Sequence, residues 1–284
     1  MMTVAPQASH RHSDKDVSMP TGADCIADSA GGLTFDIAGP GPVAAAGGTH
    51  LVLRHRDGVQ EVRLPLTPAG DGRLRAALPS SVELPEGRWD AYAQVGDGEP
   101  RRLAPGLNDL RSLVDRVPSG ARGHVAVRIP YGTKHGNLSV RSWLRAPHAE
   151  AGELRIGKGE LDVRGQVYGV EFTPDAYAEL RRREEPETVV RAEVAPDRAR
   201  FGLTVAYSEL TEGIWDLWLR PAGETGPRVR IARLLDDIAD KKPIFSYPTV
   251  TVETAYGPVE AGPYYTSDND LSVTVTPATA VSSQ

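Results

Sequence analysis

The sequence has one cysteine, Cys25, only five lysines, and no long apolar run. A single cysteine excludes intramolecular disulfides and any zinc or iron–sulfur centre built on several cysteines. No stretch approaches the roughly 18 apolar residues of a membrane-spanning helix. The first 20 residues also lack the apolar segment of a secretory signal. We therefore expect a cytoplasmic protein with no membrane span.

Basic residues are outnumbered, with 32 Lys and Arg against 38 Asp and Glu and a net charge of -6. A general nucleic-acid binder needs a basic excess or a basic face, so no nucleic-acid partner is predicted. The sequence also lacks a Gly-x-Ser-x-Gly elbow, a Walker phosphate loop and a His-Glu-x-x-His zinc motif. We accordingly predict no cofactor and no metal site.

Aromatic residues make up only 6% of the chain, whereas glycine (29) and proline (23) are frequent. Each Gly or Pro in a helix interior costs about 1–3 kcal/mol, which argues against a large helical domain. Short runs of alternating apolar and polar residues are instead separated by Gly, Pro and Asp turns, a pattern typical of β-sandwiches. At roughly 150 residues per domain, 284 residues suggest two domains.

An internal repeat relates the two halves of the chain. Residues 83–90 read ELPEGRWD and residues 209–216 read ELTEGIWD, so six of eight positions match at an offset of 126. We expect the glycine of this motif to adopt a turn conformation with positive φ, and the tryptophan to fill the space between two sheets. The carboxylates of the motif are interpreted as turn and strand-edge groups rather than as catalysts.

A second motif occurs as PYGTKHGNLSV over residues 130–140 and as PYYTSDNDLSV over residues 263–273. The strand that follows its second copy has no further unit behind it. We expect residues 271–276 to pair with the second sandwich, because an unpaired terminal strand exposes its backbone hydrogen-bonding groups. Residues 178–183 have good helix propensity, but the repeat aligns them with the predicted strand at 51–56, so we predict a strand there too.

These observations predict an all-β protein with three regions. Residues 1–30 are polar and lack periodicity, and we expect a disordered tail there. Two tandem immunoglobulin-like or fibronectin-like β-sandwich domains, related by the internal repeat, are expected over residues 31–135 and 136–284.

The loops of the second motif carry the candidate site residues. Aromatic rings beside amide and carboxylate groups suit sugar binding, because the ring stacks on the apolar face of the sugar and the polar groups bind its hydroxyls. The predicted ligand-binding residues are Tyr131, Lys134, His135, Asn137, Tyr264 and Tyr265. A repeated loop with a purely structural tyrosine is the alternative. A Ca²⁺ site at residues 268–270 stays open as well, although three adjacent residues rarely suffice to hold this ion.

The pairing of Glu-Gly-x-Trp-Asp with Tyr-x-Thr-x-x-Gly-Asn-Leu-Ser-Val resembles a known family region. This is the tandem β-sandwich region that follows the catalytic domain of actinobacterial glycosyltransferases and glycerophosphotransferases of the teichoic-acid type. The resemblance covers about residues 32–276 and implies an accessory role in cell-wall polymer biosynthesis. It carries no catalytic residue, and the nucleotide-sugar-binding domain with its Asp-x-Asp motif has no counterpart in this sequence.

Three functions remain open. The leading hypothesis is a non-catalytic protein that binds a glycan or polyol-phosphate polymer, or that assembles a partner glycosyltransferase. The second is a small-molecule biosynthetic enzyme, a cyclase, isomerase or transferase, that uses the cleft between the two sandwiches. Its candidate catalytic residues are His135, Tyr131, Asp268 and Tyr265. The third is a structural protein that forms homo-oligomers.

Overall fold

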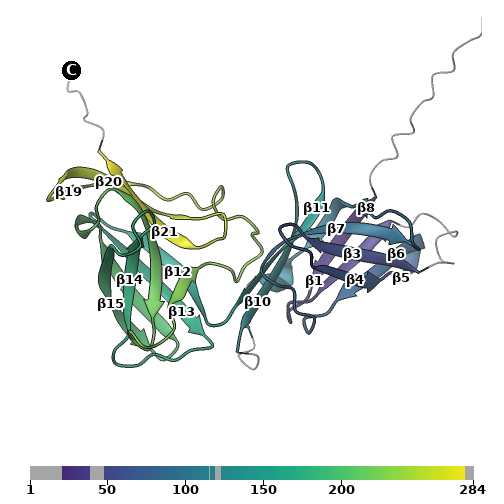
Figure 1. Ribbon diagram of the computed structural model, residues 1–284, viewed down its shortest axis with the longest axis horizontal. Helices are drawn as coiled ribbons and strands as arrows, with labels where there is room; N and C mark the ends of the chain where they lie inside the picture. Colours follow the sequence, from purple (N-terminus) through teal and green to yellow (C-terminus); the bar gives the residue numbers. More distant parts are fainter. Residues whose placement is uncertain (1–20, 39–47, 115, 119–122, 279–284) are drawn as a thin grey trace, which may run out of the picture.

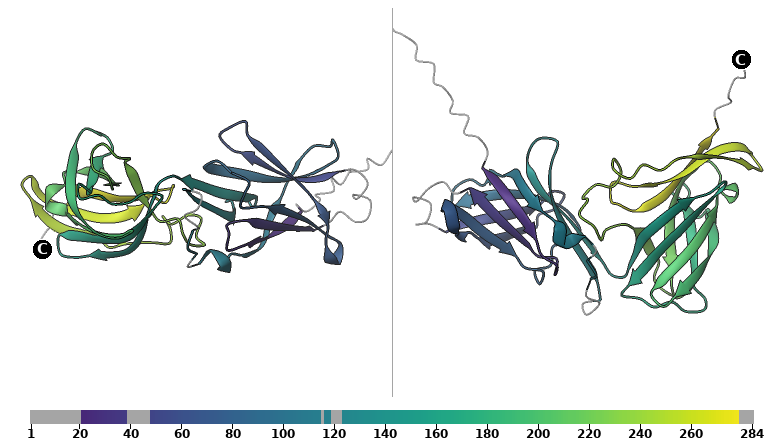
Figure 2. Two further views of the ribbon diagram at one scale, coloured as in Figure 1. Left: turned by 90° about the horizontal axis from the view of Figure 1, so that it is seen from below. Right: turned by 180° about the vertical axis from the view of Figure 1, so that it is seen from behind.

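The computed structural model describes residues 21–38, 48–114, 116–118 and 123–278. Within these ranges the regular structure is almost entirely β, and helical structure is confined to short 3-10 turns. The predicted all-β class is therefore confirmed. No helix in this part of the chain is long and apolar enough to cross a bilayer. Figures 1 and 2 show two β-rich parts side by side, joined by residues 146–147.

The first part consists of two sheets that enclose one apolar core. The smaller sheet has the order β5-β6-β2-β1-β9, and the larger has the order β10-β11-β7-β3-β4 with β8 beside β7. Phe35 from the smaller sheet and Trp89 from the larger sheet are both fully buried in this core. The strands are β1 (Gly22–Ala27), β2 (Leu33–Ala38), β3 (Thr49–His55), β4 (Glu61–Pro65), β5 (Thr67–Pro68), β6 (Arg73–Leu78), β7 (Gly87–Val95), β8 (Arg101–Arg102), β9 (Ala104–Asp109), β10 (Val125–Gly132) and β11 (Leu138–Arg145).

The second part is one ten-stranded sheet. Its strands are β12 (His148–Ile156), β13 (Glu160–Tyr168), β14 (Tyr177–Arg182), β15 (Val189–Asp197), β16 (Arg200–Ala206), β17 (Gly213–Arg220), β18 (Val229–Ala232), β19 (Val250–Thr254), β20 (Gly257–Tyr265) and β21 (Leu271–Pro277). Seven of them close in the order β14-β15-β16-β13-β12-β18-β17, because β14 also pairs with β17. The expected second sandwich is not confirmed, since β18 pairs with both β12 and β17 and so joins the layers.

Five strands follow the same order in both parts. The order β10-β11-β7-β3-β4 of the first part recurs as β20-β21-β17-β14-β15 in the second. In addition, β8 pairs with β7 as β18 pairs with β17. The strand predicted at residues 178–183 is confirmed by β14. The predicted closing strand is confirmed by β21, which pairs with β17 and β20.

Two boundaries differ from expectation. Residues 22–27 were expected to belong to the tail but form β1, because Ala23, Cys25 and Ala27 alternate into the core. Residues 1–20 of the expected tail lie outside the described residues. The boundary expected between residues 135 and 136 falls inside the β10–β11 hairpin, and β11 also pairs with β7. The division into two domains stays a prediction, and the strand pairing favours a junction at residues 146–147.

The Glu-Gly-x-Trp-Asp motif folds in the same way twice. Gly87 and Gly213 have φ angles of 147° and 138°, so both adopt the positive φ that the sequence predicts. Trp89 and Trp215 follow them and are buried in the two cores. Each indole N–H donates to the carbonyl oxygen four residues earlier, at 3.0 and 2.8 Å. The repeat therefore duplicates a turn together with the aromatic anchor that it positions.

Replacement of Gly87 by alanine is expected to lower the free energy of unfolding by about 2–3 kcal/mol. The new Cβ would clash with the imidazole of His55, which packs edge-on against the Trp89 ring at 5.0 Å. Urea denaturation measures the loss. Gly213→Ala is the matched control, because the nearest atom there is Nε of the flexible Arg182 side chain, at 2.9 Å. Equal losses for both variants would contradict the role of His55.

Candidate functional site

The two candidate loops form the same turn. In residues 133–137 and 266–270, the amide of the first residue donates to the carbonyl oxygen of the fifth, at 2.8 and 2.9 Å. The fourth residue has a φ of 72° at Gly136 and of 62° at Asn269. Glycine and asparagine are the residues that accept this left-handed conformation most readily.

The structure places the predicted site residues in different environments. Tyr265 is fully buried in the core of the second part, where its ring lies 5.9 Å from that of Phe245. This burial raises the pKa of Tyr265. The exposed residues are Lys134, His135 and Asp268, and the half-buried ones are Tyr131, Asn137 and Tyr264. No hydrogen bond or ion pair between described residues joins the two loops, so these side chains do not form one connected cluster.

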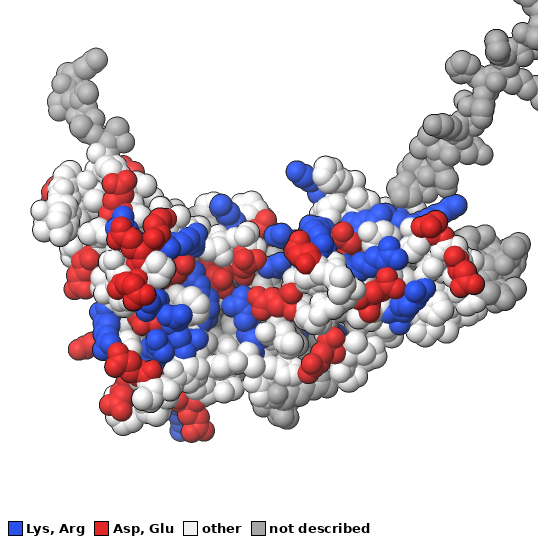
Figure 3. All heavy atoms as spheres, in the orientation of Figure 1, with Lys and Arg blue, Asp and Glu red and all other residues white. Residues whose placement is uncertain are grey.

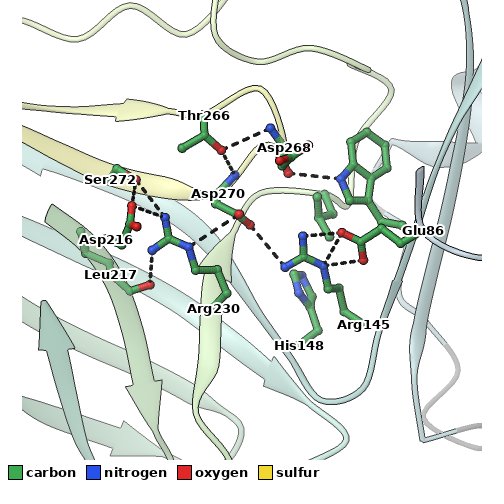
Figure 4. Close-up of polar contacts among 12 residues, drawn as sticks. Glu86, Arg145, His148, Asp216, Leu217, Arg230, Thr266, Asp268, Asp270 and Ser272 are labelled. Carbon is green, nitrogen blue, oxygen red and sulfur yellow. Dashed lines mark hydrogen bonds and ion pairs between the residues drawn. The ribbon is translucent and has the colours of Figure 1, made fainter. Parts of the chain in front are cut away.

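The loop at residues 266–270 instead contacts β11 of the first part (Figure 4). Arg141 forms an ion pair with Asp268, and Nε1 of Trp143 donates to the Asp268 carbonyl oxygen at 3.2 Å. Trp143 also belongs to an apolar cluster that includes Ala232 and Leu234 of the second part. The junction therefore combines apolar packing with polar contacts.

A chain of ion pairs crosses this junction, as Figure 4 shows. Arg145 contacts Glu86 at 2.7 Å and Asp270 at 3.3 Å. Arg230 then contacts Asp270 at 3.6 Å and Asp216 at 2.7 Å. Burial raises the pKa of Asp270, although Arg145 and Arg230 act in the opposite direction. One carboxylate thus bridges an arginine from each part.

Asp216 is the centre of a compact polar cluster. Its Oδ1 accepts hydrogen bonds from Arg183 at 2.6 Å, from Arg230 at 2.7 Å and from Ser272 at 2.8 Å. Burial opposes ionisation of Asp216, but the hydrogen bond from Arg183 and the charge of Arg230 outweigh it, so its pKa is lowered. The hydrogen bond to Asp216 in turn raises the pKa of Arg183. Both shifts favour the charged forms of Asp216 and Arg183.

An equivalent cluster lies in the first part. Asp90 accepts hydrogen bonds from Arg56 at 2.7 Å and from Ser139 at 2.8 Å, and Arg102 lies 3.2 Å away. Burial opposes ionisation of Asp90 too, and the bonds from Arg56 and Ser139 again leave its pKa lowered.

The interpretation of the motif carboxylates as turn and strand-edge groups does not predict these two clusters. The position of each polar residue directly after a core residue does indicate them. Asp90 follows the core residue Trp89, and Ser139 follows the core residue Leu138. Because side chains alternate between the faces of a strand, Asp90 and Ser139 both lie on the outer face. Their strands are neighbours, and the register pairs the two residues directly.

A cleft of about 630 Å³ lies at the junction. It is lined by residues 144–147 of the first part and the linker, and by side chains of the second part that include Arg183, Asp216, Trp218, Arg228, Arg230 and Asp270. Acidic and basic side chains both gather where the two parts meet in Figure 3. The cleft therefore carries charges of both signs, with arginine the most frequent charged residue.

Trp218 and Arg228 stack on one another in this cleft. Arg228 and Arg230 lie over the Trp218 ring, with their guanidinium carbons 4.8 and 5.0 Å from its centroid. The Arg228 side chain is 38% exposed, and its ion pair with Glu179 is long, at 3.8 Å. Nε1 of Trp218 is buried and has no acceptor among the described residues. Arg228 is therefore the side chain of this pair that a ligand in the cleft can reach directly.

The residues considered for Ca²⁺ contact separate partners. Asp268 pairs with Arg141, and Asp270 with Arg145. Asn269 accepts a hydrogen bond from the backbone amide of residue 241 at 3.0 Å. Among the described residues, no three His, Cys, Asp or Glu side chains lie close enough together to hold a metal ion.

Comparison with known proteins gives likenesses to solved structures only. No family model matches the chain. No curated protein matches it either. TarS of S. aureus is similar over 57% of this chain, with 13% identity and a TM-score of 0.40. A pullulanase from Anoxybacillus sp. LM18-11, crystallised with maltotriose, is similar over 69% of this chain, with 12% identity and a TM-score of 0.26. The matches span 29% of the TarS chain and 24% of the pullulanase chain, well under two thirds of either.

Proposed function

We propose that this chain is a non-catalytic binding protein for an anionic carbohydrate polymer of the polyol-phosphate type, and that the polymer binds in the cleft at the junction. The proposal also takes the two parts as immunoglobulin-like domains of an accessory region. The observation that supports it most is the half-exposed Arg228, which stacks on Trp218 in the cleft. Assembly with a partner glycosyltransferase or with further copies of the chain stays a prediction.

The chemistry of the cleft suits a phosphate joined to a polyol. A guanidinium group presents paired N–H donors that match two phosphate oxygens, and its weak hydration favours such contacts. Arg228 can turn toward a ligand at little cost, because its contact with Glu179 is long and Arg181 and Arg220 also contact that carboxylate. The Trp218 ring lines the cleft and supports the guanidinium groups of Arg228 and Arg230.

Binding rather than catalysis fits the arrangement of the loop residues. His135 is exposed at a hairpin tip, whereas Tyr265 is buried in the core of the second part. Asp268, the third candidate for acid–base chemistry, is held by Arg141. A general acid or base must lie within hydrogen-bond reach of its target, and these three groups face different surroundings.

Calorimetric titration with a glycerol-phosphate oligomer of twelve phosphates tests the proposal. We expect Arg228→Ala to weaken binding at least tenfold, because it removes a phosphate contact without unpairing a buried charge. Arg111→Ala is the control, since Arg111 is 90% exposed beside Asp109 and lies outside the cleft. A maltohexaose titration reports on neutral glycans. Equal affinity of Arg228→Ala and the wild type, or no heat with the wild type, would overturn the proposal.

A further inference from the structure

The five strands that follow the same order in both parts carry matching rows of side chains on their outer faces. The strand registers place the residues of each row directly opposite one another on neighbouring strands. The matched pairs are Tyr131 and Tyr264, Ser139 and Ser272, Asp90 and Asp216, Arg54 and Arg181, Arg63 and Arg191, Tyr92 and Trp218, and Arg102 and Arg230. The repeat therefore duplicates a charged surface as well as a fold.

The aromatic residue of each face is flanked by two arginines. In the first part, the guanidinium carbons of Arg54 and Arg102 lie 5.1 and 5.0 Å from the Tyr92 ring centroid. These distances are close to the 4.8 and 5.0 Å found at the Trp218 ring. A pair of arginines on an aromatic ring thus recurs in the first part, with Arg102 at the position of Arg230 and Arg54 of β3 in place of Arg228.

We name as the first arginine face the four residues Arg54, Arg56, Arg63 and Arg102 around Tyr92. Their side chains are 43%, 36%, 48% and 24% exposed, and Nη1 of Arg102, the least exposed of the four, is buried.

The carboxylates that contact this face are Glu61 and Asp90, two negative charges against four positive ones. The face therefore keeps a positive excess that can bind anions, even though the chain as a whole carries a net charge of -6.

We propose that the first arginine face is a second binding site for the same phosphodiester polymer, so that one polymer chain engages both parts of the protein. This inference rests on the function proposed above. Tyr131 lies beside Ser139 in the same row, which brings one of the predicted ligand-binding residues into this site. Lys134 and His135 are exposed at the tip of the same hairpin.

The geometry of β11 favours a single polymer that reaches both sites. Ser139 contacts the cluster of the first part, and Arg145, six residues further along, lines the cleft. Both lie on one face of the strand, about 20 Å apart at roughly 3.3 Å per residue. The loop at residues 266–270 covers Arg141 and Trp143 between them, so the polymer would pass beside this loop. A polymer of several repeats can span this distance, and its second contact is then intramolecular and adds avidity.

Two probes separate this inference from the proposed function. A glycerol-phosphate oligomer with two phosphates is too short to bridge the sites, and we expect calorimetry to give two bound oligomers per wild-type chain. Arg54→Ala and Arg228→Ala should each reduce this number to one. With twelve phosphates, each variant should bind at least tenfold more weakly than the wild type, because avidity is lost. Arg111→Ala, at a position 90% exposed beside Asp109, is the charge-matched control.

Each outcome has a distinct meaning. If Arg228→Ala weakens binding but Arg54→Ala does not, and the wild type binds one short oligomer, the second site is refuted while the proposed function stands. If neither oligomer binds the wild type, the proposed function and this inference both fail. If Arg111→Ala weakens binding as much as Arg54→Ala, the attraction is a property of the overall charge, and the second site is again refuted.

Discussion

Replacement of Asp216 by alanine is expected to lower the free energy of unfolding by about 3–5 kcal/mol, which is the usual cost of unpairing a buried charge. The Asp216 carboxylate accepts hydrogen bonds from Arg183, Arg230 and Ser272. The Arg230 side chain is only 8% exposed, and burial already lowers its pKa. Without Asp216, Arg230 would keep Asp270 at 3.6 Å as its nearest carboxylate. Its buried charge would therefore be poorly compensated.

The first part offers a matched control for this variant. Asp90 holds the equivalent position, but its arginine partners Arg56 and Arg102 are 36% and 24% exposed, so water can solvate them when the carboxylate is removed. We expect Asp90→Ala to cost on the order of 1 kcal/mol. Chemical denaturation of both variants measures the difference. The double variant Asp216→Leu/Arg230→Met should recover much of the loss, because it removes both charges together. Equal losses for Asp90→Ala and Asp216→Ala would refute the argument from burial.

The strands of the repeat were predictable from the sequence, because alternation and turn residues act locally. The Glu-Gly-x-Trp-Asp motif predicts a turn and a buried tryptophan in each half. The turns are observed at Gly87 and Gly213, and each is followed by a buried tryptophan. The alignment of residues 178–183 with 51–56 outweighed a misleading helix propensity. By contrast, β1 is built on small residues such as Ala23 and Ala27, whose weak apolar pattern does not predict a strand.

The junction could not be predicted from the repeat, because the two halves differ there. Arg141, Trp143 and Arg145 make the contacts across the junction, and the repeat aligns them with Thr274, Thr276 and Ala278. Because these residues occur in one half only, aligning the two halves does not reveal their contacts. The closed sheet of the second part could not be predicted from the repeat either. It depends on the short strand β18, which pairs in parallel with β12 across a long separation in sequence.

Replacement of Trp215 by alanine is the other change with a large expected effect, a loss of about 3–5 kcal/mol in the free energy of unfolding. The Trp215 side chain is 1% exposed, and its truncation leaves a cavity in the core of the second part. It also leaves the carbonyl oxygen of Thr211 without the indole donor at 2.8 Å. Thermal or chemical denaturation measures this loss.

Trp218 lies three residues further along the same strand and provides the contrasting variant. Strand alternation places Trp215 in the core and Trp218 on the outer face, where it lines the cleft. Trp218→Ala should therefore cost much less stability than Trp215→Ala, yet weaken binding of the twelve-phosphate oligomer at least tenfold. Trp215→Ala, titrated where it is still folded, should bind the oligomer as the wild type does. A loss of stability in Trp218→Ala equal to that in Trp215→Ala would mean that Trp218 serves packing and not the ligand.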